Sequence, residues 1–312
     1  INDDYGCLAF DTVNVFQPDP LQSSIVVTSD ALCNGSSDAY GSISVSGGTP
    51  AYQYSWSVGS SSDSTISNVP AGTYTVLVTD ANNCQDDIDV IFEEPSIITL
   101  KVDDISNNLC FGDSQGSITL SAYGGVPNYV TYFIESSLGV ISSQSSNIFT
   151  NLLSDNYNVW VKDANGCLSD KLISEKVGEP GRIQLTPIVT PSSCFESNDG
   201  IINLIFENGV APYNYQLSNI NGAFDNGIVF QHSDSLIVEN LSEGDYYFEV
   251  IDYNNCEDSI SVKITQPSDI IANFSIDEDL ILERNTVTVT NLSTGANYFS
   301  WNFGDDSSNS NE

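Results

Sequence analysis

Cysteine is the residue type in this 312-residue chain whose spacing points most directly to chemistry. The seven cysteines fall two to a repeating block, which is typical of a disulfide framework in an oxidising compartment. We expect one bond within each block, namely Cys33 with Cys84, Cys110 with Cys167 and Cys194 with Cys256. Cys7 is left to pair with a residue upstream of Ile1. Each bond would stabilise its block by roughly 3–4 kcal/mol on the chain-entropy model.

Two other uses of these cysteines are open. They could be free buried thiols. They could also bind zinc, which is less favoured because Cys-x-x-Cys spacing is absent and His232 is the only histidine.

Acidic and amide side chains recur in a short segment before the second cysteine of each block. Oxygens of this kind on a tight turn are what calcium accepts, so calcium is the one candidate cofactor. The alternative, favoured for any single loop, is that Asp and Asn are good hairpin residues. The candidate ligands are Asp80, Asn82, Asp163, Asn165, Asp252 and Asn254.

The chain shows little sign of catalytic chemistry. Paired carboxylates have almost no specificity among 42 acidic residues, and a serine triad would depend on His232 in a polar stretch of one block. No glycine-rich phosphate loop precedes a helix. Trp56 and Trp160 could be sugar-stacking platforms, but core packing is the favoured role. We therefore expect a chain that is not an enzyme.

Composition narrows the class of protein further. Seven Lys plus Arg against 42 Asp plus Glu give a net charge of −35, which would repel nucleic acid. The content of Ser, Thr, Val, Ile and Tyr is that of a folded β-protein. No run of 18 apolar residues and no signal peptide is present, so we expect an internal fragment whose anchor lies outside the segment. Export is inferred from the cysteines.

Internal repetition organises the chain. Residues 72–84, 155–167 and 244–256 share a Tyr, alternating apolar residues and Asp-x-x-x-Cys, and Asp3 to Cys7 fits the last part of the same pattern. The repeat is about 80 residues long. Each unit closes with an x-Pro segment, which predicts stiff junctions and a semi-rigid rod.

Period-two apolar runs, such as Tyr74 to Val78, are separated by turn clusters, such as Gly47-Gly48-Thr49-Pro50. This pattern predicts all-β, Ig-like or fibronectin III-like antiparallel sandwiches of about seven strands, in tandem. An apolar residue five before Tyr74, Tyr157 or Tyr246 predicts a tyrosine corner. The expected segments are 1–20 (the last strand of a preceding repeat), 21–96, 97–180 and 181–268 (three whole repeats), and 269–312 (part of another sandwich).

These motifs also carry a family resemblance. Cys33, Gly41-Ser42-Ile43, Gly47 to Tyr52 and Gly72 to Cys84 together resemble the SprB repeat of Bacteroidota surface proteins, and the later copies follow the same pattern. Residues 286–306 resemble the first half of a PKD domain.

The resemblance implies a large cell-surface adhesin exported by type IX secretion, acting in gliding motility or attachment. Its partners would be a surface polysaccharide or other cell-surface ligand, the neighbouring repeats, and the secretion and gliding machinery. The alternative is a set of accessory modules from a secreted polysaccharide-degrading enzyme. Asp-Ser/Thr-aliphatic triplets also resemble the O-glycosylation acceptor of that phylum, at Thr12, Ser235 and Ser259.

Overall fold

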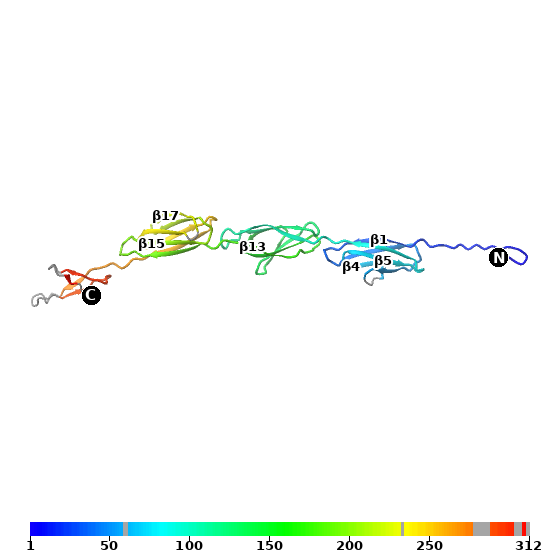
Figure 1. The fold of residues 1–312 in the computed structure, drawn as a ribbon, viewed down its shortest axis with the longest axis horizontal. Coiled ribbons are helices and arrows are strands. Elements are labelled where there is room, and N and C mark those ends of the chain that lie inside the picture. Colours follow the sequence, from blue (N-terminus) through cyan, green and yellow to red (C-terminus); the bar gives the residue numbers. More distant parts are fainter. Residues whose placement is uncertain (59–61, 232–233, 277–287, 303–307, 310–312) are drawn as a thin grey trace, which may run out of the picture. The chain divides into compact units, whose positions relative to one another are not determined.

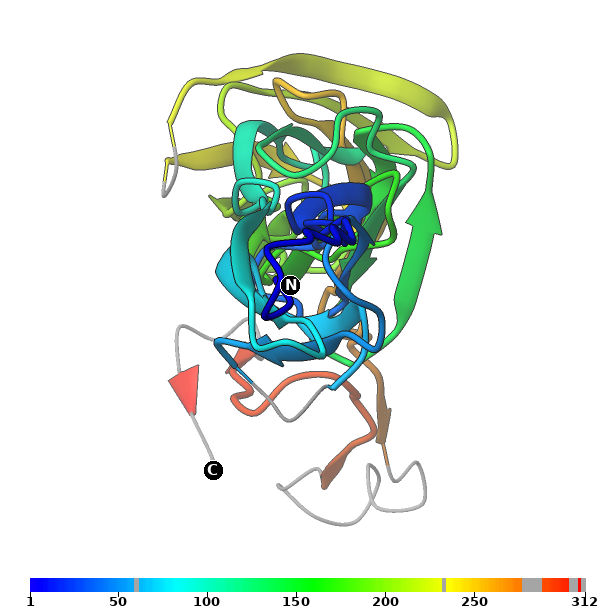
Figure 2. The same ribbon diagram turned by 90° about the vertical axis from the view of Figure 1, so that its right-hand side faces the viewer.

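The computed structural model describes residues 1–58, 62–231, 234–276, 288–302 and 308–309. Within these ranges the backbone forms β-strands and loops and no helix, as two perpendicular views show (Figure 1, Figure 2). Accordingly, this part of the chain has no helix that could cross a membrane.

The first repeat folds into two facing antiparallel sheets. One has the order β1-β2-β4 and the other β3-β5-β6. Alternation within β5 follows the pleat, with Tyr74, Val76 and Val78 buried and the residues between them more exposed. The strands are β1 (Gln22–Ser29), β2 (Ala39–Ser46), β3 (Gln53–Trp56), β4 (Thr65–Val69), β5 (Gly72–Thr79) and β6 (Gln85–Phe92).

In the described residues, the second and third repeats have seven strands each. Their sheets are β11-β8-β7 with β10-β9-β12-β13, and β14-β15-β18 with β17-β16-β19-β20. The second repeat contains β7 (Thr99–Ser106), β8 (Gly116–Tyr123), β9 (Thr131–Glu135), β10 (Ile141–Gln144), β11 (Ile148–Leu152), β12 (Asp155–Lys162) and β13 (Leu172–Val177). The third contains β14 (Gln184–Thr190), β15 (Gly200–Glu207), β16 (Tyr213–Asn219), β17 (Gly222–Val229), β18 (Ser235–Leu241), β19 (Gly244–Ile251) and β20 (Glu257–Ile264).

This strand order confirms the predicted fold class. Three strands face four, with the fourth added beside β9 or β16, which is an arrangement of Ig-like and fibronectin III-like sandwiches. The period-two apolar pattern predicts this class of fold, because one face of each sheet must be buried.

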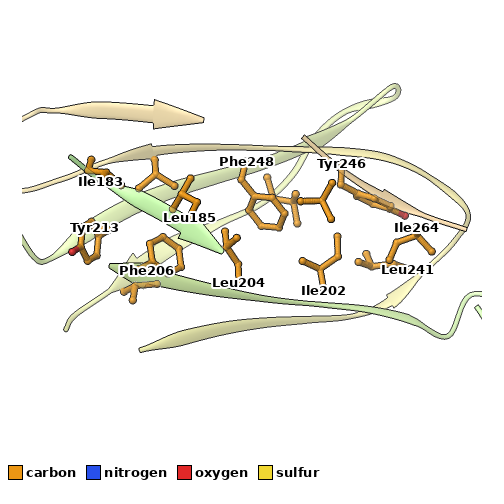
Figure 3. Close-up of a cluster of buried hydrophobic side chains, with 14 residues drawn as sticks. Ile183, Leu185, Ile202, Leu204, Phe206, Tyr213, Leu241, Tyr246, Phe248 and Ile264 are labelled. Atoms are coloured by element: carbon orange, nitrogen blue, oxygen red, sulfur yellow. The ribbon is translucent and has the colours of Figure 1, made fainter. Parts of the chain in front are cut away.

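The core of the third repeat lies between its two sheets. Phe206 and Leu204 come from one sheet, while Tyr213 and Phe248 come from the other, and all four are fully buried. Figure 3 shows these labelled side chains facing one another across the sandwich. Burial of each such side chain stabilises the fold by about 1.5–3 kcal/mol, so the core, and not ion pairing, holds the repeat together.

Both candidate platform tryptophans are core residues. Trp56 is buried and its Nε1–H donates to the carbonyl oxygen of Asp63 at 3.0 Å. Trp160 is buried and stacks on Phe133, with ring centroids 5.1 Å apart. The core-packing interpretation is therefore confirmed.

The predicted tyrosine corner is confirmed in the first and third repeats. The hydroxyl of Tyr74 donates to the carbonyl oxygen of Pro70 at 2.8 Å, and that of Tyr246 donates to Ser242 at 2.9 Å. In each case the phenol ties the start of a central strand to the chain four residues earlier.

After residue 268 the described chain forms two small antiparallel sheets of two strands each. They pair β21 (Phe274–Ile276) with β22 (Val289–Asn291), and β23 (Trp301–Asn302) with β24 (Ser308–Asn309). The PKD-like interpretation of this segment stays a prediction, and parts of residues 286–306 lie outside the described residues.

Contacts between Cα atoms group the chain into two units. One holds residues 1–106, 117–150 and 155–177, and the other holds 107–116, 151–154 and 178–312. The loop 107–116, which belongs to the second repeat by sequence, thus groups with the third repeat. The segment boundaries and the rod-like arrangement predicted above stay predictions.

Candidate functional site: the disulfide-bonded junctions

The cysteine pairing is the main correction to the sequence analysis. The structure joins Cys33 to Cys167, with Cα atoms 5.6 Å apart, and Cys110 to Cys256, with Cα atoms 5.5 Å apart. The first cysteine of one repeat is therefore bonded to the second cysteine of the next. The predicted pairs Cys33–Cys84, Cys110–Cys167 and Cys194–Cys256 are wrong.

Strand length is the physical reason. Cys84 directly precedes β6, whereas the loop that holds Cys33 is hydrogen-bonded to Glu94, which follows β6. Eight residues of strand span about 27 Å, and a disulfide needs Cα atoms within about 7 Å. Two cysteines at opposite ends of one sandwich cannot meet, but each can meet a cysteine of the adjoining repeat.

The loop of the first cysteine is fastened to the end of its own repeat. The side-chain amide of Asn34 donates to Glu94 Oε1 and to the carbonyl oxygen of Pro95, both at 3.0 Å. The N–H of Gly35 donates to Glu94 Oε2 at 2.6 Å. The last strand and the x-Pro segment thus fix where Cys33 lies.

The hairpin of the second cysteine is fastened by a buried carboxylate. Asp163 Oδ1 accepts the N–H groups of Asn165 at 3.0 Å and Cys167 at 2.9 Å, and Oδ2 accepts the N–H of Val126 at 2.9 Å. Asp163 is fully buried. Its charge is compensated by these three donors, which hold the hairpin against the Gly-Gly-x-Pro loop.

The same anchor recurs in the other two repeats. Asp80 accepts from Asn82, Cys84 and Thr49, each at 2.8 Å, and Asp252 occupies the equivalent place in the third repeat. The N–H of Thr49 is the largest of the causes that hold the pKa of Asp80 below its ordinary value. These hydrogen bonds confirm the hairpin role of the Asp residues.

The first junction adds a polar contact beside the disulfide. The side-chain amide of Asn165 donates to the carbonyl oxygen of Leu32 at 2.9 Å, next to the Cys33–Cys167 bond. Asn165 belongs to the second repeat and Leu32 to the first. The amide and the disulfide therefore hold the two repeats together at one point.

The second junction is built in the same way. Asn254 donates to the carbonyl oxygen of Leu109 at 2.9 Å beside the Cys110–Cys256 bond. Gly112 N–H donates to Glu179 Oε2 at 2.7 Å, as Gly35 does to Glu94. Because the same bonds recur at both junctions, the junction is a regular structural feature of the repeat.

The x-Pro segment before the second repeat is also hydrogen-bonded to the Gly-Gly turn that follows β8. The N–H of Gly125 donates to the carbonyl oxygen of Ser96 at 2.8 Å. Gly124 has a φ of 78°, and a Cβ there would lie 2.0 Å from the carbonyl oxygen of Ile97. Only glycine fits at this position, because both the backbone conformation and the space exclude a side chain.

A second tyrosine closes the proline-containing turn loop of each repeat, a role that the sequence analysis missed. The hydroxyls of Tyr52 and Tyr129 donate to the carbonyl oxygens of Gly47 and Gly124, at 2.7 and 2.6 Å, and Tyr213 donates to Asn208. The fixed spacing of five residues between acceptor and tyrosine in the sequence is the signal that could have revealed it.

Three cysteines are exposed and form no disulfide in the structure: Cys7, Cys84 and Cys194. Cys84 stands at the position that is bonded in Cys167 and Cys256, and Cys194 at the position bonded in Cys33 and Cys110. The positions in the repeat are the same, so these thiols are chemically suited to the same kind of bond.

Calcium binding by the hairpin loops stays a prediction. The amide groups of Asn165 and Asn254 face carbonyl oxygens of the preceding repeat, and that of Asn82 donates to Thr49 Oγ1 at 2.8 Å. Among the described residues, no three His, Cys, Asp or Glu side chains gather as a metal site would require.

The candidate glycosylation residues Thr12, Ser235 and Ser259 are all exposed. Exposure is necessary for modification, which itself stays a prediction. His232, the one histidine of the chain, lies outside the described residues.

The fold and the junctions together define a class of protein: tandem Ig-like sandwiches cross-linked between consecutive domains. Three segments of the chain, residues 25–61, 102–132 and 186–222, match the model of the SprB repeat family. A search of curated protein sequences finds no match.

Solved structures of tandem β-sandwiches are similar to this chain at low identity. Three N-terminal domains of the outer capsid protein Hoc of bacteriophage RB49 are 12% identical, covering 80% of this chain and 100% of that one, with a TM-score of 0.38. A tetra-tandem repeat from the extending region of a large adhesion protein is 15% identical, covering 90% and 82%, with a TM-score of 0.28. Two fibronectin type III domains of chicken tenascin are 13% identical, covering 55% and 99%, with a TM-score of 0.22.

Proposed function

We propose that this chain is a non-catalytic stretch of a large bacterial cell-surface adhesin. In this proposal the repeats form a disulfide-stapled spacer that also contacts surfaces weakly during attachment or gliding. The observation that carries the proposal is the combination of three SprB repeats with a covalent cross-link at each junction between them. Disulfides persist in oxidising compartments, which supports a place outside the cell.

The proposed partners are a surface polysaccharide or another cell-surface ligand, together with the type IX secretion and gliding machinery. Many weak contacts along one chain would give avidity without a single strong site. The net charge of −35 supports partners other than nucleic acid.

Deletion of residues 21–268 in the producing bacterium tests the proposal. We expect loss of surface attachment or gliding, while an epitope tag on the remaining protein still reaches the surface. A strain that carries the tag alone is the control. Normal attachment and gliding after the deletion would contradict an adhesive role.

The accessory-module alternative rests on the PKD-like resemblance after residue 285. The full-length gene distinguishes the two: a hydrolase domain with its acid pair favours the enzyme, and a long run of further repeats favours the adhesin. For calcium, a lower melting temperature on chelation is expected because a ligand of the folded state stabilises it, and an unchanged melting curve would contradict a structural calcium.

A further inference from the structure

The two disulfide bonds overlap along the chain. Cys110 lies between Cys33 and Cys167, and Cys167 lies between Cys110 and Cys256. Both bonds therefore span the residues from 110 to 167. Bonds confined to single repeats would share no residues at all.

From this overlap we propose that the bonds form a redundant tether that limits how far the chain can be stretched. Either bond alone prevents most of the extension that the chain would have without disulfides. The inference goes beyond the proposed function, because it follows from covalent connectivity whatever the chain contacts. It assigns the junctions a mechanical role in addition to holding neighbouring repeats together.

The limit follows from the shortest covalent route between Cys33 and Cys256. Without disulfides the route is 223 residues, from position 33 to position 256. With both bonds it crosses from Cys33 to Cys167, returns to Cys110 through 57 residues (167 to 110), and crosses to Cys256. A stretched chain becomes taut along this route even when every sandwich has unfolded.

Loss of one bond changes this route little. With only Cys110–Cys256 the route is 77 residues, from 33 to 110, and with only Cys33–Cys167 it is 89 residues, from 167 to 256. At about 3.3–3.6 Å per extended residue, the pair of bonds removes roughly 550–600 Å of extension, and loss of one restores only about 70–110 Å. Loss of one bond thus lengthens the stretched chain only slightly, because the other bond still restricts it.

The arrangement matters because the bonds lie at the surface of the junctions. Cys33, Cys110 and Cys256 are only half-buried, so reductants can reach them. If each bond limited only its own repeat, every reduction would release its own length of chain. Overlap instead postpones the large extension until both bonds are lost.

Single-molecule stretching of the full chain from its two ends tests the proposal, with protein purified without reductant. The variants replace both partners of a bond, so that no new free thiol is created: Cys33→Ser with Cys167→Ser, Cys110→Ser with Cys256→Ser, and all four together. The matched control is Cys84→Ser with Cys194→Ser, which removes two cysteines that are unbonded in the structure.

We expect the taut length to grow by about 70–110 Å in each two-site variant and by roughly 550–600 Å in the four-site variant, with no change in the control. Additive increases, or a longer control, would overturn the proposal, because both are the signatures of bonds within single repeats. The taut length depends on covalent connectivity alone, so a variant whose remaining bond is confirmed by peptide mass mapping gives a decisive result even if its sandwiches are destabilised.

Discussion

The side-chain amide of Asn165 donates a hydrogen bond to the carbonyl oxygen of Leu32 across the first junction, at 2.9 Å. Asn254 and Leu109 repeat this relationship at the second junction. At each junction, the asparagine of a hairpin loop thus binds the backbone of the preceding repeat, directly beside the disulfide that joins the two repeats.

Replacement of this amide should expose the neighbouring disulfide to reductant. A hydrogen bond of this kind contributes about 1 kcal/mol, so Asn165→Ala should open the junction about five times more often and speed reduction of Cys33–Cys167 to the same degree. Timed alkylation after addition of dithiothreitol, followed by peptide mass mapping, measures the rate.

Asn82→Ala is the matched control, because Asn82 holds the same place in the first repeat but donates to Thr49 within that repeat. It should leave the reduction rate of Cys33–Cys167 unchanged. Equal reduction rates in wild type and Asn165→Ala would show that the amide does not protect the disulfide from reductant.

The buried carboxylate of Asp252 should be among the most sensitive positions of the third repeat. Asp252→Ala leaves the N–H groups of Val210, Asn254 and Cys256 without their acceptor, which should lower the free energy of unfolding by about 3 kcal/mol or more. Urea denaturation measures the loss. Asp245→Ala, which removes an exposed carboxylate of β19, should stay within about 0.5 kcal/mol of wild type.

Tyr246→Phe tests the tyrosine corner, because it removes only the phenolic oxygen. Loss of the hydrogen bond to Ser242 leaves a carbonyl oxygen unpaired and should lower the free energy of unfolding by about 1 kcal/mol. Tyr247→Phe at the next residue, whose side chain is 47% exposed, is the control and should change little. Denaturation midpoints that agree for the two variants would contradict the role of the corner.

Acid should weaken the loop of Cys194 through Asp199. Hydrogen bonds from Ser193 and then Ser197 lower the pKa of Asp199 from 3.8 to about 2. A pKa lowered by folding means that the carboxylate stabilises the folded state fully above its ordinary pKa and that this contribution is lost as the pH falls from about 4 towards 2.

Ser197→Ala removes one of these donors, so its stability should fall less steeply over the same range. Melting temperatures at several pH values from 5 to 2 measure the slope. Because acid also relieves the repulsion within a chain of net charge −35, only the difference between variant and wild type reports on Asp199. Identical slopes would contradict the assignment.

Much of the fold could be predicted because its causes are local. The alternation of β5, the Gly-Gly-x-Pro turn and the corner at Tyr74 each depend on residues a few positions apart, and the structure has all three. Part of the candidate site was also predictable: the Asp-x-x-x-Cys segment was correctly expected to be a hairpin. The sequence pattern gave no indication that Asp163 is fully buried, because this depends on a loop 37 residues earlier.

The amino-acid sequence by itself determined the repeat, the class of fold and the presence of a disulfide framework, because spacing and alternation are properties of the chain in one dimension. Only the tertiary structure decided which cysteines meet. The last strand separates the two cysteine-bearing ends of each sandwich, with eight residues in the first and third repeats and six in the second. The docking of consecutive repeats instead brings Cys33 to Cys167 and Cys110 to Cys256. The disulfide pairing therefore depends on where each strand ends in space. The number of cysteines per repeat does not reveal this.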